Sequence, residues 1–330
     1  MASVKQELTV IGTEILPRFA PASPTRDKPQ VSAAQPPEIF DRALLAARLD
    51  RAWRGGADRR GADFLLRRAA DELAERLAVV KRAFAFAVDA GAPGPHAAAA
   101  LAARPGGGAT LRLAPTAASA GSGDFSVLVG DLERLPLAAE SADLVVSLLA
   151  LHHVNDLPGA MIQIRRALRP DGLFVAALAG GDTLTELRQS LTVAESEIAG
   201  GVSPRVAPFA DARALGGLMQ RAGFALPVVD VDSLVARYAD LFSLMRDLRA
   251  FGAANALTER SRKPLSRAVL ARATEVYAER FADPDGRLRA TFETVWLTGW
   301  APHESQPKPL RPGSATTRLA DALKPREGDR

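Results

Sequence analysis

Five short, continuously apolar runs in the middle of the chain constrain its fold more than any other feature. They occupy residues 84–90, 110–113, 125–129, 143–150 and 173–179. Because these runs are apolar throughout instead of alternating with polar residues, they are typical of strands buried on both faces of a parallel sheet. The amphipathic segment 63–82 precedes the first run, and another, 157–168, lies between the fourth run and the fifth. Right-handed crossovers join such units into a doubly wound, Rossmann-like α/β sheet with helices on both faces, which is the fold class we expect.

The pattern changes after residue 181, where helical segments predominate. Thr183 and Glu186 have the spacing of a capping box, which predicts a helix that starts there. We also expect a helix over 212–222, helices within 238–281, and strands at 228–235 and 290–300. Both ends of the chain are rich in proline, so we expect a disordered lead over 1–37 and an extended tail with a short helix near 315–323.

The composition excludes several classes of protein. The chain has no cysteine, which rules out disulfides, thiolate zinc sites and a cysteine nucleophile. It carries 42 basic and 38 acidic residues, and its short arginine pairs lack interleaved aromatic residues, so we expect no nucleic-acid partner. No stretch approaches the roughly 18 to 20 apolar residues that span a bilayer. We therefore expect a cytoplasmic protein without a transmembrane segment.

A glycine turn follows the first apolar run, at residues 89–95. Glycine at the carboxyl end of a first strand lets the backbone approach a nucleotide-type ligand closely. The candidate cofactor-binding residues of this turn are Asp89, Gly91, Ala92 and Gly94. Pro93 and Pro95 interrupt a full glycine cradle, since proline removes an amide donor and fixes φ. A tight turn without a ligand is an equally good interpretation of this segment.

An acidic residue follows the third run, in Gly130-Asp131-Leu132. At that edge of the sheet, Asp131 can accept a hydrogen bond from an exocyclic amine while Leu132 packs against a flat base. The alternative interpretation is that Asp131 caps a loop or a short helix.

Two histidines and an asparagine, His152, His153 and Asn155, follow the fourth run. Because His152 and His153 are adjacent, we expect them to point in different directions. They then cannot share a metal ion, and no third ligand lies nearby, so we expect no metal site. Neutral imidazole both donates and accepts hydrogen bonds. His152, His153 and Asn155 are therefore candidates for orienting a substrate.

In their order along the chain, these motifs resemble those of class I S-adenosylmethionine (SAM)-dependent methyltransferases, specifically the methyltransferase type 11 group. Within that superfamily the chain looks like bacterial relatives of the mitochondrial complex I assembly proteins, which include an arginine hydroxylase with a methyltransferase fold. The segments that carry the resemblance are 39–42, 130–137, 151–158, 168–174, 180–188, 200–208, 221–224, 290–292 and 297–302. Those up to the Arg169-Pro170-Asp171-Gly172 turn are shared by many methyltransferases, and those after it are more specific to this group.

The resemblance implies a seven-stranded, mostly parallel sheet with an N-terminal helical extension and a helical insertion before the last strands. It implies one methyltransferase-like domain over 38–302, between the lead 1–37 and the tail 303–330. Within that domain it implies N-terminal helices over 38–82, a cofactor-binding half over 83–180 and a family-specific half over 181–302.

The resemblance also implies SAM as the cofactor and a role for individual residues. The Gly91 turn would face the methionine part of SAM, and Asp131 with Leu132 would face the adenine. Leu149 and His152 would lie near the sulfonium. The implied partner is a complex I subunit or another protein, and the basic ends of the chain leave room for contact with an acidic partner or a membrane face.

The chain departs from the methyltransferase pattern at the cofactor edge. Besides Pro93 and Pro95, it lacks the acid that usually meets the ribose hydroxyls after the second strand, at about Ala114. Two hypotheses follow. In the first, the chain is a SAM-dependent enzyme that modifies or assembles a complex I component. In the second, it is a catalytically silent assembly factor or chaperone that has weakened or lost SAM binding.

Overall fold

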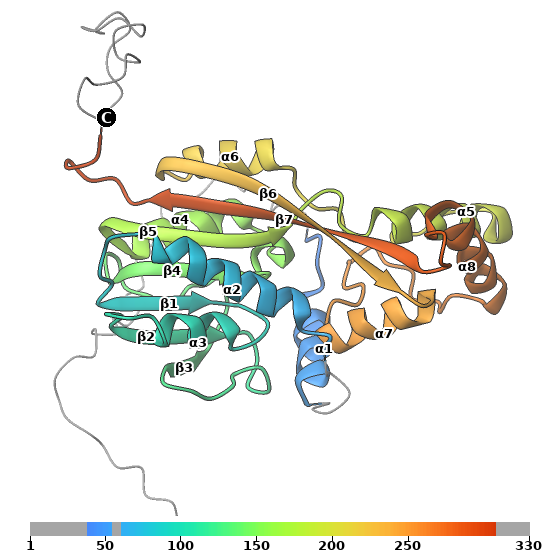
Figure 1. The fold of residues 1–330 in the computed structure, drawn as a ribbon, viewed down its shortest axis with the longest axis horizontal. Helices are drawn as coiled ribbons and strands as arrows, with labels where there is room; N and C mark the ends of the chain where they lie inside the picture. Colours follow the sequence, from blue (N-terminus) through green and yellow to red (C-terminus); the bar gives the residue numbers. More distant parts are fainter. Residues whose placement is uncertain (1–37, 55–60, 308–330) are drawn as a thin grey trace, which may run out of the picture.

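The computed structural model of the protein describes residues 38–54 and 61–307. Our expectations for the lead 1–37 and for a helix near 315–323 lie outside these residues. The described part contains one seven-stranded sheet in the order β3-β2-β1-β4-β5-β7-β6 (Figure 1). Its strands are β1 (Phe86–Ala90), β2 (Ala109–Ala114), β3 (Ser126–Val129), β4 (Ala142–Leu148), β5 (Leu168–Ala179), β6 (Ala225–Tyr238) and β7 (Leu288–Trp300). Neighbouring strands are parallel except for β7, which runs antiparallel to both β5 and β6, so the expected doubly wound, mostly parallel sheet is confirmed.

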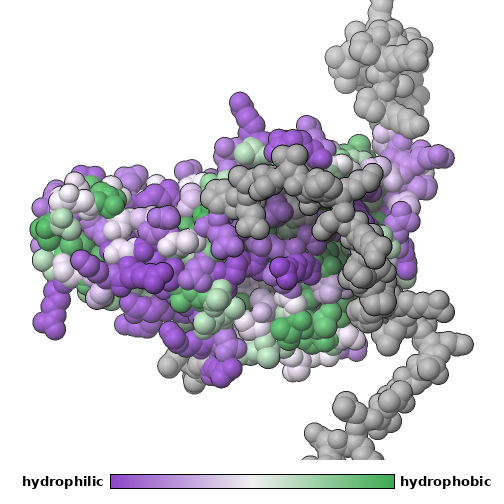
Figure 2. Space-filling model, turned by 180° about the vertical axis from the view of Figure 1, so that it is seen from behind, coloured by the Kyte–Doolittle hydropathy of each residue, from purple (hydrophilic) through white to green (hydrophobic). Residues whose placement is uncertain are grey.

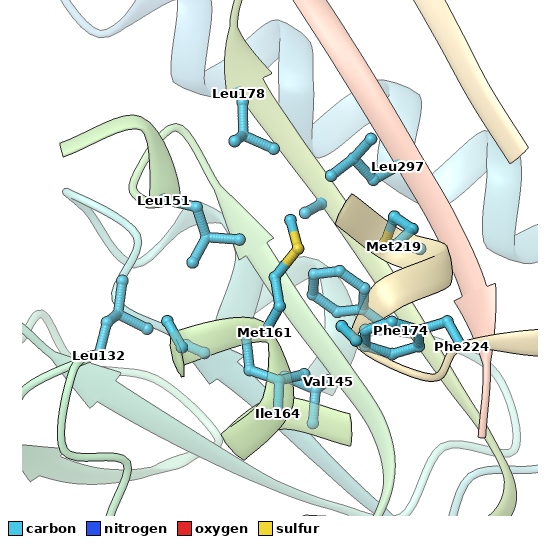
Figure 3. Packing of buried hydrophobic residues seen from close by; sticks show 14 of the residues in the cluster. Leu132, Val145, Leu151, Met161, Ile164, Phe174, Leu178, Met219, Phe224 and Leu297 are labelled. Carbon is cyan, nitrogen blue, oxygen red and sulfur yellow. The ribbon is translucent and has the colours of Figure 1, made fainter. Parts of the chain in front are cut away.

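Helices cover both faces of the sheet because the central strands are apolar on both sides. On one face, α4 (Leu157–Ala167) and α6 (Ala212–Arg221) pack on the strands, and Met161 of α4 inserts toward Phe174 of β5 (Figure 3). On the other face lie α2 (Phe64–Ala78) and α3 (His96–Ala102), through residues such as Leu66 and Leu101. Seen from behind, the surface is mostly hydrophilic, with apolar side chains in separate patches (Figure 2).

The last two strands extend beyond the rest of the sheet. Strand β5 pairs with β7 only from Leu173 to Ala179, whereas residues 288–293 of β7 continue to pair with residues 233–238 of β6. We call these two segments the overhang. A separate hydrophobic cluster forms around the overhang with α5 (Thr185–Ala199), α7 (Leu241–Phe251) and α8 (Arg267–Phe281) (Figure 1). The remaining helices of residues 38–54 and 61–307 are α1 (Arg42–Arg54), beside α7, and the short 3₁₀ helix η2 (Leu151–His153).

The capping-box prediction at Thr183 and Glu186 is wrong. Helix α5 begins at Thr185, and the residue before it, Leu184, has φ +56° and makes no side-chain cap. The Thr183 hydroxyl instead donates to the carbonyl of Glu293 at 2.9 Å and accepts from its N–H at 3.1 Å. The Glu186 carboxylate accepts from the N–H of Thr291 at 3.0 Å. Both side chains therefore tether α5 to β7.

The helices predicted over 212–222 and within 238–281 are confirmed, as are the late strands, which are longer than expected. Among the described residues, no helix is both long enough and apolar enough to cross a membrane.

Candidate functional site

The turn after β1 requires glycine at position 91. Gly91 has φ +77°, a region that side chains disfavour, and its N–H donates to the carbonyl of Leu113 at 2.9 Å. A Cβ at this position would lie 2.5 Å from Cδ1 of Leu132. The turn and Leu132, which come from the carboxyl ends of β1 and β3, thus pack directly on each other.

A buried ion pair lies beneath this turn. Asp89 of β1 and Arg112 of β2 are paired residues of neighbouring strands, and both side chains are fully buried. Arg112 also donates to the carbonyls of Ala92 at 3.0 Å, Ser119 at 2.8 Å and Ala120 at 2.8 Å. Burial raises the pKa of Asp89 to about 6, against the opposing effect of the guanidinium. Arg112, which the motif analysis missed, therefore holds the glycine turn to the loop after β2.

A cavity of about 430 Å³ opens in front of the turn. Its lining includes the candidate residues Gly91, Asp131, Leu132 and Leu149, together with Pro93 and His153. We call it the cofactor cavity. Helix α1 forms one wall through residues such as Leu45 and Leu49.

The other candidates in the glycine turn lie behind the wall of this cavity. Asp89 and Ala92 are fully buried. Gly94 faces away from the cavity, because a Cβ there would lie 2.2 Å from the ring of Trp53.

The carboxylate of Asp131 lies at the cavity with one oxygen engaged. Oδ1 accepts from Arg42 of α1 and from the N–H of Glu133 at 2.9 Å. The described residues provide no hydrogen-bond partner for Oδ2. Asp131 therefore presents an acceptor in the cavity, while Arg42 ties α1 to the end of β3.

The two histidines lie side by side in η2, with ring centroids 4.2 Å apart. The expectation that they point in different directions holds only in part, because both line a second cavity and His153 also lines the first. Burial holds the pKa of His152 well below its ordinary value. Burial and the charge of Arg42 lower the pKa of His153 to about 4. Both rings are therefore neutral at pH 7.

Hydrogen bonds within the protein determine which polar atoms of His152 and Asn155 are left to contact a ligand. The Nδ1 atom of His152 accepts from the N–H of Ala179 at 3.3 Å, so the proton of the neutral ring resides on Nε2. Asn155 lies outside both cavities. Its amide accepts from the N–H of Phe40 at 2.8 Å and donates to the carbonyl of Phe40 at 3.0 Å. Asn155 thereby fixes the entry to α1.

The second cavity has a volume of about 410 Å³, and we call it the acceptor chamber. Leu187, Val206, Met245, Leu248 and Phe292 give it a largely apolar lining. It adjoins the cofactor cavity, with which it shares Leu149, His153, Phe251 and Ala253. Leu149 has φ +51°, so the backbone is strained where the two cavities meet.

The strand order and the paired cavities at the carboxyl ends of β1 and β4 are those of a class I SAM-dependent methyltransferase. A family profile described as "Methyltransferase domain" matches residues 102–176. The arginine-hydroxylase NDUFAF5, mitochondrial, of Danio rerio is 36% identical over 302 residues, covering 89% of this chain and 92% of its own. The malonyl-[acyl-carrier protein] O-methyltransferase of Laribacter hongkongensis is 36% identical over 292 residues, covering 84% of this chain and 90% of its own. The chain belongs to this methyltransferase family.

Among solved structures, the YcgJ protein of Bacillus subtilis superposes with a TM-score of 0.50 at 15% identity. The match covers 72% of this chain and 99% of that protein, and it supports the fold alone.

SAM is the cofactor that this class implies, and the cavity can be tested against it. Gly91 lets Leu132 pack on the turn, Asp131 offers a free oxygen, and Leu132 provides an apolar wall. At the end of β2 the cavity is lined by Pro115, whereas Ala114, where we expected the missing acid position, is fully buried. The residues fit SAM at the turn and on the adenine side, and they leave the ribose hydroxyls without a carboxylate.

Proposed function

We propose that the chain binds SAM in the cofactor cavity and transfers its methyl group to an acceptor held in the acceptor chamber. The observation that carries this proposal is the shared wall of the two cavities at Leu149 and His153. A methyl donor in one cavity and an acceptor in the other would meet at that wall, and such positioning is a large part of catalysis in bimolecular transfer.

The residues of the chain have separate parts in this mechanism. When bound, SAM supplies an electrophilic methyl group on its sulfonium. Gly91 and Asp131 with Leu132 would hold its methionine and adenine ends. The protonated Nε2 of His152 can donate a hydrogen bond that orients the acceptor. Neutral His153 can take up the proton that an N–H or O–H acceptor loses when its nitrogen or oxygen bonds to the methyl carbon.

We further propose that the acceptor is, or belongs to, a component of respiratory complex I. The resemblance to complex I assembly proteins and the similarity to NDUFAF5 over nearly the whole chain support this assignment. The name of NDUFAF5 specifies hydroxylation of arginine, whereas that of the malonyl-[acyl-carrier protein] O-methyltransferase specifies O-methylation. Mass spectrometry of a complex I subunit incubated with the protein and SAM distinguishes the two, since one product gains a methyl group and the other an oxygen atom.

Isothermal titration with SAM tests the proposal directly. At protein concentrations of about 100 μM we expect saturable binding, and Gly91→Ala should weaken it about tenfold or more because its Cβ would displace Leu132. Gly106→Ala is the matched control, since Gly106 also has a positive φ (+69°) but open space around it. No heat from folded wild-type protein would overturn the enzyme proposal.

A catalytically silent assembly factor is the second candidate, favoured by Pro93 and Pro115 in the cofactor cavity. The variant Pro93→Gly/Pro115→Asp supplies the missing amide donor and ribose acceptor at positions that line the cavity. SAM binding by this variant, together with none by the wild type, would support the silent factor. Methyl transfer by the wild type would exclude it.

A further inference from the structure

A third cavity, of about 380 Å³, opens next to the acceptor chamber and is strongly basic. Its lining contains the cations Arg48, Arg205, Arg260, Arg262 and Lys263. No carboxylate lines this cavity among the residues that the structure describes. We call it the basic cavity.

Much of this positive charge is uncompensated. Arg205 pairs with Glu195 at 2.6 Å, and Arg260 pairs with Asp41 at 3.1 Å. Within 38–54 and 61–307, the structure provides no ion pair for the other three cations of the lining. Burial and the neighbouring charges of Arg260 and Arg51 lower the pKa of Arg48, against the opposing charge of Asp41. The cations thus repel one another, and an anion placed among them would relieve that repulsion.

The basic cavity continues into the acceptor chamber. Arg48, Arg205 and Asn255 line both. It has no lining residue in common with the cofactor cavity, from which α1 separates it. Arg48 and Leu44, four residues apart and on one side of α1, face the basic cavity.

We propose that the methyl acceptor is an amphipathic anion, whose apolar part fills the acceptor chamber and whose carboxylate or phosphate binds in the basic cavity. Guanidinium groups match the geometry of both oxyanions and bind them with two parallel hydrogen bonds. An apolar molecule alone would fill the chamber but leave Arg48, Arg262 and Lys263 without an ion pair among the described residues. The inference rests on the proposed function in one respect, namely that the chamber receives the acceptor.

Titrations without SAM test this inference separately from the proposed function. The probes are decyl phosphate, decanoate, decanol and decyltrimethylammonium, each below its micelle concentration. We expect the two anions to bind at least about tenfold more tightly than decanol and the cation. Preference for decyl phosphate, with inorganic phosphate as its competitor, would assign the site to a phosphate group, and preference for decanoate would assign it to a carboxylate.

A variant in which the charge of the exposed loop after α7 is reversed tests the role of the basic cavity. Arg262→Glu/Lys263→Glu should weaken binding of the preferred anion about tenfold or more and leave decanol unaffected. The matched control is Arg213→Glu/Arg221→Glu on α6, which changes the charge equally and touches none of the three cavities. Equal affinities for all four probes, or equal losses in the two variants, would overturn the inference. SAM titration of the same variants reports on the cofactor cavity alone, so the two proposals fail independently.

Discussion

The two ends of the sheet are stabilised in different ways. At the cofactor end, strands such as β1, of five residues, and β3, of four, are short, and the turn rests on the buried pair of Asp89 and Arg112. At the other end, β6 and β7 have 14 and 13 residues, and the overhang is covered by α5, α7 and α8. There, side chains from the covering helices bond to the backbone of β7. The Tyr277 hydroxyl donates to the carbonyl of Arg289 at 2.8 Å, and the Glu186 carboxylate accepts from the N–H of Thr291 at 3.0 Å.

This difference indicates how the geometry of each cavity responds to mutation. One charged side chain, Arg112, holds three carbonyls and a carboxylate, so the geometry of the cofactor cavity depends on a single residue. The acceptor chamber is lined by many apolar residues from several helices, and each contributes little. Mutations should therefore affect the cofactor end sharply and the acceptor end gradually.

The largest effect is expected from Arg112→Met. This change leaves Asp89 buried without its partner and three carbonyls without a donor, which should cost about 3–5 kcal/mol of unfolding free energy. Urea denaturation followed by circular dichroism measures it. The double variant Asp89→Asn/Arg112→Met should be less destabilised than the single one. A single variant as stable as the wild type would mean that the pair does not hold the turn.

An effect of intermediate size on stability is expected from the titration of His153, which lies at the junction of the two cavities. Its pKa is about 4 in the folded protein, because of burial and of Arg42, and about 6.5 when unfolded. The unfolded chain therefore binds more protons between these values, so stability is fully present above pH 6.5 and falls as the pH drops toward 4. Because the ring is partly exposed, we expect the unfolding free energy to fall by about 1–2 kcal/mol.

The measurement is urea denaturation across this pH range for the wild type and His153→Gln. The difference between the two curves isolates His153 from the other groups that titrate in the range. Parallel curves would show that the ring is accessible to solvent and titrates normally.

The smallest effect is expected from Thr183→Val at the overhang. It removes the hydroxyl that bridges the N–H and carbonyl of Glu293, at a cost of about 1 kcal/mol. Thermal unfolding should show the loss, and SAM titration should be unchanged. Thr185→Val is the control, because Thr185 begins the same helix and its hydroxyl accepts from Gln189 of that helix. A loss of SAM affinity in Thr183→Val would contradict the separation of the two ends.

The parallel part of the fold was predictable from sequence because burial on both faces leaves a local signal, a run of apolar residues. The late strands were also predictable, at 228–235 and 290–300, but their extension beyond β5 into the overhang was not, since it depends on partners that lie far away along the chain. The capping-box error has the same origin. Thr183 and Glu186 satisfy a local spacing rule, yet both bond to residues more than 100 positions away in β7.

The candidate site was predictable to a similar degree. Gly91, Asp131 and Leu132 follow apolar runs and Leu149 lies near the end of one, and the structure brings all four together around one cavity. Arg112 left a signal that motif reading passed over, namely a charged residue inside an otherwise apolar strand opposite Asp89. The position facing the ribose could not be assigned between Ala114 and Pro115, because the exact end of a strand depends on its neighbours.

Helix α1 forms a wall of the cofactor cavity with Leu45 and Leu49, and of the basic cavity with Leu44 and Arg48. If a ligand on one side displaced this helix, the shape offered on the other side would change. Occupancy of the two cavities would then be thermodynamically linked, and the linkage would be reciprocal. By whatever factor an anion in the basic cavity changes the affinity for SAM, SAM changes the affinity for that anion by the same factor.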